Sequence, residues 1–154
     1  MSTSEKKIRH VGFIMDGNGR WAKRKNKPRS YGHKKGADTI EKVIEECYNQ
    51  GVEVVSLYAF STENWSRPKD EIDTIFDLLR TFLQKYTKKL LDDKIRLIIS
   101  GDLSPVDEKL RLACLELIEK TKNFKEHTLN IALNYGSRAE IIRAINLLKD
   151  KEVP

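Results

Sequence analysis

The sequence predicts an α/β protein in which helices flank an open, mainly parallel sheet of four visible strands. Short runs dense in Val, Ile, Leu and Phe alternate with longer stretches of helical periodicity, which is typical of βαβ units. The 154 residues suffice for one compact domain and are too few for two ordinary ones. With 39% hydrophobic and 34% charged residues, the composition excludes disordered, collagen-like and disulfide-stapled proteins. We therefore expect a single domain over residues 1–154.

The four strands are expected at residues 8–15, 52–60, 95–100 and 128–134. Each run is dense in Val, Ile, Leu or Phe on both faces, so helices are expected to cover both faces of the sheet. Each run is followed by polar residues or Gly. In an open α/β sheet the carboxyl ends of the strands form the edge where ligands bind, so these segments are the first candidates for a site.

Four helices are expected between and after these strands. The first covers residues 38–49 and stops at Gly51, and the second begins near Pro68 and presents one long apolar face. A third opens at residues 104–107. A fourth opens at Ser137, where Ser137 and Glu140 have the spacing of a capping box.

The sequence contains no run near the roughly 20 apolar residues of a membrane span, and its first residues lack the apolar stretch of a secretion signal. We therefore expect a cytoplasmic protein. Cys47 and Cys114 lie on predicted apolar helix faces, which favours two reduced, buried thiols over a disulfide or a metal pair.

The net charge of +6 comes wholly from the N-terminal part of the chain. Residues 1–36 contain 11 Lys/Arg and 2 Asp/Glu, whereas the remainder contains 18 and 21. Such a cluster indicates an anionic partner, and a nucleic-acid-binding module is one candidate class. The basic residues here accompany Gly-rich turns at a strand end, which suits one small diphosphate better.

The first candidate motif is Asp16-Gly17-Asn18-Gly19-Arg20-Trp21, where a strand is expected to turn into a helix. Paired glycines let a backbone approach a ligand closely, and Arg20 adds a forked cation for phosphate oxygens. An acid beside phosphates makes sense if Asp16 holds a divalent ion such as Mg²⁺. The alternative, a tight turn whose Asp caps the helix, is equally compatible with the spacing.

The motif continues into a basic segment from Lys23 to Gly36. Taken alone, this segment is typical of a solvated loop. As a continuation of the first motif, its Arg29, His33, Lys34 and Lys35 would supply a cationic wall for an anionic substrate, with His33 as a proton or hydrogen-bond donor.

The second expected strand is followed by a dense polar set from Ser61 to Pro68. Asn64 or Ser66 could cap the long helix, and Trp65 could serve as its hydrophobic staple. The sheet edge offers a second interpretation, in which Ser61, Asn64 and Arg67 face the same site as Asp16.

The apolar face of the long helix is most simply core. Its aromatic and branched residues beside a phosphate-binding edge also fit a slot for a long hydrocarbon tail. The residues on this face are Ile72, Ile75, Phe76, Leu79, Phe82, Leu83, Tyr86 and Leu90.

Several spaced motifs resemble one family. These motifs are residues 16–22, Arg29 with Gly32-His33, and Tyr58 to Pro68. At these positions the chain resembles the cis-prenyltransferases, and more narrowly the bacterial undecaprenyl diphosphate synthases. The resemblance continues through residues 99–102 and 129–136. It therefore covers essentially every residue after the short N-terminus.

The resemblance implies an enzyme of isoprenoid synthesis that adds isopentenyl diphosphate units to farnesyl diphosphate, with Mg²⁺ as cofactor. Asp16 would bind Mg²⁺, Asn64 would accept a proton, and His33 would assist at the diphosphate. The other residues that would bind substrate are Gly17, Asn18, Gly19, Arg20, Trp21, Arg29, Ser61, Thr62, Glu63, Trp65 and Arg67. The growing tail would run along the long apolar helix, and release of the product would bring the protein to a membrane surface.

Members of this family usually continue past the matched region. They add an Arg/Arg-x-Ser cluster for isopentenyl diphosphate, a later Glu for Mg²⁺ and much of a homodimer interface. None of these follows Ser137 to Glu140 here. We therefore expect a C-terminally truncated form that binds the allylic diphosphate and performs little or no condensation, and the resemblance does not predict a dimer for it. A short paralogue that binds without catalysis is the alternative.

Overall fold

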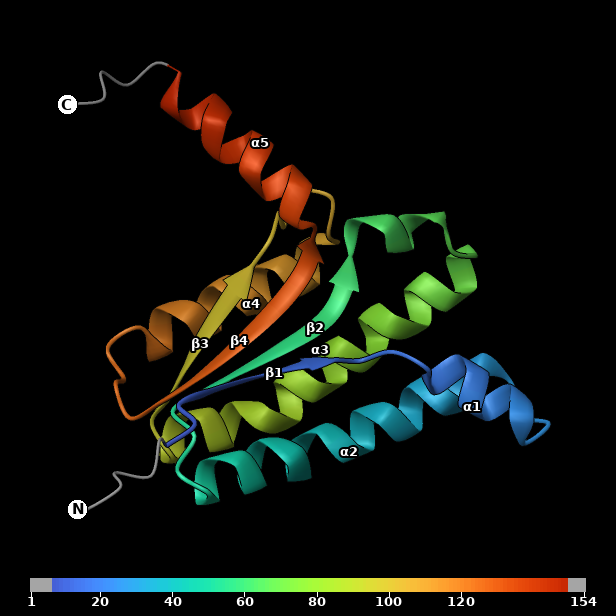
Figure 1. Cartoon of the computed structure of the whole chain (residues 1–154), viewed down its shortest axis with the longest axis horizontal. Helices are drawn as coiled ribbons and strands as arrows, with labels where there is room; N and C mark the ends of the chain where they lie inside the picture. Colours follow the sequence, from blue (N-terminus) through green and yellow to red (C-terminus); the bar gives the residue numbers. More distant parts are fainter. Residues whose placement is uncertain (1–6, 150–154) are drawn as a thin grey trace, which may run out of the picture.

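The computed structural model describes residues 7–149 and has four parallel strands in the order β1-β2-β4-β3 (Figure 1). The strands are β1 (His10–Ile14), β2 (Val54–Ser61), β3 (Ile95–Ser100) and β4 (His127–Tyr135). All three neighbouring pairs run parallel. The predicted fold class is confirmed, and each expected strand is found with its ends moved by at most two residues.

The helices are α1 (Asn18–Arg24), α2 (Arg29–Asn49), α3 (Lys69–Asp92), α4 (Glu108–Thr121) and α5 (Ser137–Leu148), with a short 3-10 helix, η1 (Thr62–Ser66), before α3. α2 begins nine residues earlier than expected. Consequently most of the segment from Lys23 to Gly36, expected to be a loop, is helical. Pro28 stands at the N-cap of α2 in extended conformation, which suits a residue that cannot donate a backbone hydrogen bond.

Helices α2, α3 and α4 pack on one face of the sheet and enclose the core with it (Figure 1). The largest fully buried side chains include Tyr86 and Leu83 from α3, Leu110 from α4 and Leu129 and Leu133 from β4. Burial raises the pKa of the Cys114 thiol in this core to about 11. Cys47 is partly buried, and both cysteines are free, as predicted.

The opposite face of the sheet carries no packed helix in the described residues, so the expectation of helices on both faces is wrong here. A row of polar side chains crosses this face instead. Ser56 Oγ lies 2.8 Å from His10 Nε2 and accepts a hydrogen bond from Asn130 Nδ2 at 3.1 Å, while Ser100 Oγ donates to Asn130 Oδ1 at 2.9 Å. These four side chains, one from each strand, are hydrogen-bonding partners of one another across the whole sheet.

The final helix, α5, projects away from the sheet, and none of its described residues is buried (Figure 1). Its N-cap is Gly136, without a side-chain capping bond, so the predicted capping box at Ser137 does not form. No helix among residues 7–149 is long and apolar enough to cross a membrane.

Candidate active site at the carboxyl ends of β1 and β2

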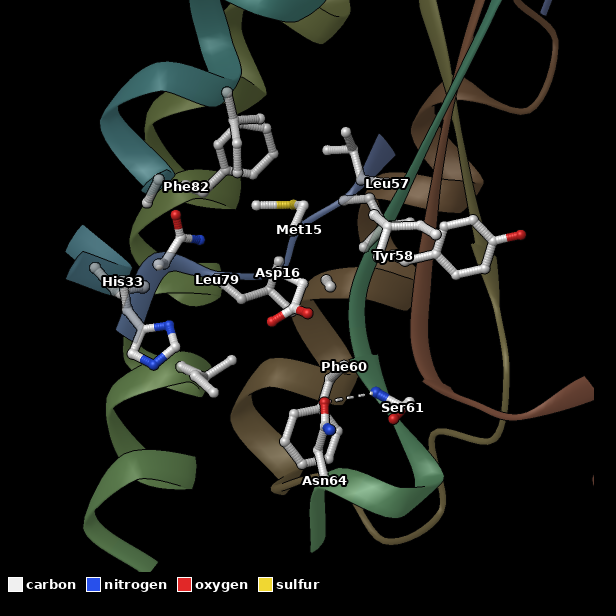
Figure 2. A pocket seen from close by; sticks show the side chains of 18 of the residues that line it. Met15, Asp16, His33, Leu57, Tyr58, Phe60, Ser61, Asn64, Leu79 and Phe82 are labelled. Carbon is white, nitrogen blue, oxygen red and sulfur yellow. Dashed lines mark hydrogen bonds between the residues drawn. The ribbon is translucent and has the colours of Figure 1, made fainter. Parts of the chain in front are cut away.

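A cavity of about 400 Å³ opens where β1 and β2 end, as expected for an open α/β sheet (Figure 2). Its polar wall comes from three parts of the chain that are distant in sequence: the loop after β1, the first turns of α2, and the segment between β2 and α3. The polar residues of this wall are Asp16, Asn18, His33, Ser61, Asn64 and Arg67. Sequence analysis had predicted all six as site residues.

The rest of the cavity wall is mostly apolar, and α3 and β2 contribute most of it. Ile75, Leu78, Leu79 and Phe82 face the cavity, and Ile40 of α2 joins them. In Figure 2 the carboxylate of Asp16 lies among the polar side chains, with Leu79 and Phe82 lining the same space. The predicted apolar face of the long helix thus divides: part of it is core, and part lines this cavity.

The loop after β1 takes its shape from Gly17 and from two close contacts with α2. Gly17 has a φ of 86°, a left-handed conformation that favours glycine, and is the N-cap of α1. A Cβ at Gly32 would lie 2.0 Å from the backbone oxygen of Asn18, and one at Gly36 would lie 2.6 Å from Asn18 Nδ2. Glycine at positions 32 and 36 therefore lets α2 press against the loop and hold Asn18 at the cavity.

Asp16 stands exposed at the end of β1. Its Oδ2 lies 2.8 Å from Arg20 Nη2 one helical turn away, and its Oδ1 accepts from the backbone N–H of Gly17. No side chain caps α1, so the alternative in which Asp16 is simply the cap of the helix is not what the structure has. The carboxylate is accessible, and only an exposed arginine opposes its charge.

Glu71 gathers three predicted site residues around one carboxylate. Its Oε1 accepts hydrogen bonds from Arg29 Nη2 at 3.0 Å and from Arg67 Nη1 at 3.1 Å, and His33 Nε2 lies 3.1 Å away. The Glu71 side chain is only 9% exposed. Burial acts to raise the pKa of this carboxyl, but the hydrogen bonds from Arg29 and His33 and the charges of Arg29 and Arg67 outweigh it and lower the pKa.

Glu71 was not among the site residues that the sequence predicted. Its partners Arg29 and His33 lie 42 and 38 residues away, on another helix, and no local pattern reports such a contact. The composition of the sequence provided an indirect indication of such an acid, because a basic cluster that packs against a helix needs an acid on the facing surface.

The turn between β2 and α3 is fixed by Asn64. Its Oδ1 accepts a hydrogen bond from the backbone N–H of Ser61 at 3.1 Å, closing a capping box around η1. Trp65 packs edge-on against Phe60 and donates from Nε1 to Asn134 Oδ1 at 2.8 Å. Asn64 therefore caps η1, and α3 begins after Pro68 without a side-chain cap.

The other predicted site residues lie around the cavity at varying distance. Gly17 and Trp21 line an adjoining cavity of about 510 Å³, and Arg29 shares a smaller one of about 220 Å³ with His33 and Glu71. Five predicted residues line none of these three cavities: Gly19, Arg20, Thr62, Glu63 and Trp65. The chemical roles predicted for the site residues, whether or not they line a cavity, remain predictions.

Within residues 7–149, no group of three or more His, Cys, Asp and Glu side chains could hold a metal ion. Among the residues that line the cavity of about 400 Å³, Asp16 is the only one with a carboxylate. Mg²⁺ is commonly held by one or two carboxylates together with substrate phosphates and water, so one carboxylate beside an anion site fits this ion when a diphosphate supplies the other oxygens.

Fold and cavity together define an α/β protein whose parallel sheet presents a polar pocket with an apolar extension at the carboxyl ends of its strands. A sequence profile described as "Putative undecaprenyl diphosphate synthase" matches residues 14–153. The chain belongs to this family of isoprenyl transferases.

Two relatives show the extent of the similarity. The isoprenyl transferase of Fusobacterium nucleatum is 48% identical over 148 residues, which are 95% of this chain and 64% of that protein. The isoprenyl transferase of Clostridium tetani is 48% identical over 145 residues, 94% of this chain and 57% of that protein. The chain thus spans about three fifths of the length of these relatives.

Two solved structures have the same fold. A probable undecaprenyl diphosphate synthase from Campylobacter jejuni superposes with a TM-score of 0.78 at 37% identity, covering 97% of this chain and 66% of the other. Lavandulyl diphosphate synthase from Lavandula x intermedia, in complex with dimethylallyl diphosphate, superposes with a TM-score of 0.86 at 26% identity, covering 92% and 62%.

Proposed function

We propose that the cavity binds an allylic diphosphate, farnesyl diphosphate, as donor in a prenyl transfer to isopentenyl diphosphate. The product of the whole reaction would be a long cis-polyprenyl diphosphate such as undecaprenyl diphosphate. The observation that carries the proposal is the two-part wall of one cavity: polar and cationic groups on one part, and apolar side chains from α3 and β2 on the other. An amphiphile with a diphosphate head and a hydrocarbon tail matches both parts.

At the diphosphate end, Arg67 and His33 line the cavity and Arg29 stands behind them on the same carboxylate. These groups would stabilise the negative charge that grows on the diphosphate as it leaves the allylic carbon. Their shared contact with Glu71 holds them in place before substrate arrives, so little reorganisation is needed during the reaction.

Mg²⁺, when bound, would neutralise part of the diphosphate charge and so ease its departure. Asp16 is the side chain that would hold it, since its carboxylate is exposed and lines the cavity. Arg20, now paired with Asp16, would turn to the diphosphate when the ion takes its place. Asn64 belongs to the same polar wall of the cavity, and its Oδ1 keeps a second lone pair for a proton-bearing group.

Equilibrium dialysis with labelled farnesyl diphosphate, with and without Mg²⁺, tests the proposal. We expect binding that needs Mg²⁺ and that Asp16→Ala abolishes, while the exposed Asp92→Ala on α3 leaves it unchanged. Unchanged binding by Asp16→Ala would instead support a non-catalytic partner protein of the same fold.

A second assay separates binding from catalysis. When labelled isopentenyl diphosphate is added, the 154-residue chain should give little or no butanol-extractable product. The reason is that the cations around the cavity form a single cluster around one carboxylate, and such a cluster suits one diphosphate. Efficient formation of long-chain product would overturn this expectation.

A further inference from the structure

The helical hairpin formed by α1 and the start of α2 extends beyond the carboxyl end of β1, at one end of the molecule (Figure 1). Residues 17–37 contain eight Lys/Arg and no Asp/Glu. Three of the eight pair with an acid outside this range: Arg20 with Asp16, Arg29 with Glu71, and Lys35 with Asp38 at 3.9 Å. The six cations other than Arg20 and Arg29 are all exposed: Lys23, Arg24, Lys25, Lys27, Lys34 and Lys35.

Two aromatic side chains stand among these six cations. The rings of Trp21 and Tyr31 are nearly parallel, with centroids 6.0 Å apart, and both are about 40% exposed. The ammonium of Lys25 lies over the Trp21 ring at 5.2 Å, and that of Lys35 lies over the Tyr31 ring at 6.0 Å. We call these two aromatics and the six cations the basic aromatic patch.

The patch borders an apolar opening. Trp21 and Lys35 line the cavity of about 510 Å³, whose other walls include Phe13, Met15 and Val43. Ile14, at the end of β1, belongs to the wall of this cavity and is 80% exposed. This cavity shares Met15, Asp16, Asn18, Ile40 and Leu57 with the candidate active site, so the two spaces adjoin.

We propose that the basic aromatic patch docks on an anionic lipid bilayer. Lys and Arg near a bilayer are attracted by its acidic headgroups, and Trp and Tyr settle at the headgroup level, where an apolar ring and a polar atom are both satisfied. A bilayer also offers hydrocarbon to Ile14 and to the apolar opening. A nucleic acid would match the charge and would leave this apolar surface in water.

Docking in this orientation points the adjoining cavity toward the lipid, so that a long hydrocarbon chain can pass from the site into the bilayer without crossing water. This consequence rests on the proposed function. The docking itself rests on the patch and on the apolar opening beside it, not on the proposed substrate, so vesicle binding and farnesyl diphosphate binding are measured separately.

Sedimentation of the 154-residue chain with phosphatidylcholine vesicles, with and without about 30% phosphatidylglycerol, tests the proposal. We expect binding only with the anionic lipid, falling as salt rises because exposed charges are screened. The variant Lys23→Gln/Lys25→Gln/Lys27→Gln should bind roughly a hundredfold more weakly, since each cation near the surface contributes about a factor of five. Tyr31→Ala should weaken binding several-fold at any salt concentration.

The matched control Lys85→Gln/Lys88→Gln/Lys109→Gln removes the same charge from exposed positions on α3 and α4 and should keep wild-type binding. Circular dichroism checks that each variant is folded, and retained binding of farnesyl diphosphate by the Lys23/Lys25/Lys27 variant separates this proposal from the previous one. Equal losses in both triple variants, equal binding to neutral vesicles, or binding to single-stranded or duplex nucleic acid in place of vesicles would overturn it.

Discussion

The guanidinium of Arg29 and the carboxylate of Glu71 join the first turn of α2 to the first turn of α3. Nη2 of Arg29 donates to Oε1 of Glu71 at 3.0 Å, and Nε lies 2.9 Å from Oε2. Because α2 presses on the loop after β1 and α3 forms the apolar wall, this one ion pair ties the polar and the apolar halves of the cavity together.

Replacing Glu71 should therefore loosen the whole cavity. We expect Glu71→Gln to lower the free energy of unfolding by about 2 kcal/mol, because Arg29, Arg67 and His33 lose the charge that balances them in a largely buried position. Urea denaturation at neutral pH measures this change. The exposed Glu126→Gln should stay within about 0.5 kcal/mol of the wild type. If Glu71→Gln had the same free energy of unfolding as the wild type, the cluster around Glu71 would not stabilise the fold.

The same carboxylate predicts how stability depends on pH. The pKa of Glu71 is lowered from 4.5 because the hydrogen bonds and charges of its cationic partners outweigh its burial. A lowered folded pKa contributes stability that is present above the unfolded pKa and lost as pH falls through the folded value. The stability difference between wild type and Glu71→Gln should thus be constant near neutral pH and shrink below about 4.5. A difference that stays unchanged in acid would contradict the assignment.

The sequence predicted the strands better than the helices around the site. Buried parallel strands are continuous apolar runs, so their positions are visible without knowledge of the fold. The start of α2 was missed because Pro28, Gly32 and Gly36 are typical of loops. The structure shows that both glycines are needed for close contact with Asn18, a tertiary reason that no local pattern contains.

Site prediction divides in the same way. Asp16 and Asn64 lie two and three residues after the ends of β1 and β2, and the edge of a parallel sheet brings such positions together. Glu71 acts through partners about 40 residues away. The bare face of the sheet was also missed, because Ser56 and Asn130 each lie between two apolar neighbours in the sequence and their mutual hydrogen bond depends on strand order.

The substitution Gly32→Ala, which adds one methyl group, tests the contact between Gly32 and Asn18. A Cβ at position 32 would lie 2.0 Å from the Asn18 backbone oxygen, so Gly32→Ala must push α2 away from the loop. We expect a loss of about 2 kcal/mol in unfolding free energy and weaker binding of farnesyl diphosphate. At Gly12 the nearest atom to a Cβ is 3.9 Å away, and Gly12→Ala should leave both properties intact. Wild-type binding by Gly32→Ala would mean that the loop does not need this packing.

Filling the apolar part of the cavity should discriminate between tails of different length. Ala37 of α2 lines the cavity, and a phenyl group there occupies space opposite α3. We expect Ala37→Phe to weaken binding of farnesyl diphosphate at least tenfold more than binding of dimethylallyl diphosphate, whose tail is shorter, because each buried methylene contributes about 0.8 kcal/mol. The exposed Ala139→Leu is the control. Equal losses for the two ligands would place the tail elsewhere.

The central claim is that one cavity binds the head and the tail of an allylic diphosphate together. Calorimetric titration of the chain in Mg²⁺ with farnesyl diphosphate, inorganic pyrophosphate and farnesol tests it most directly. We predict that farnesyl diphosphate binds at least about a hundredfold more tightly than either fragment, and that Arg67→Ala removes most of this advantage. Equal affinity for farnesyl diphosphate and pyrophosphate, or no binding of any of the three, would contradict the claim.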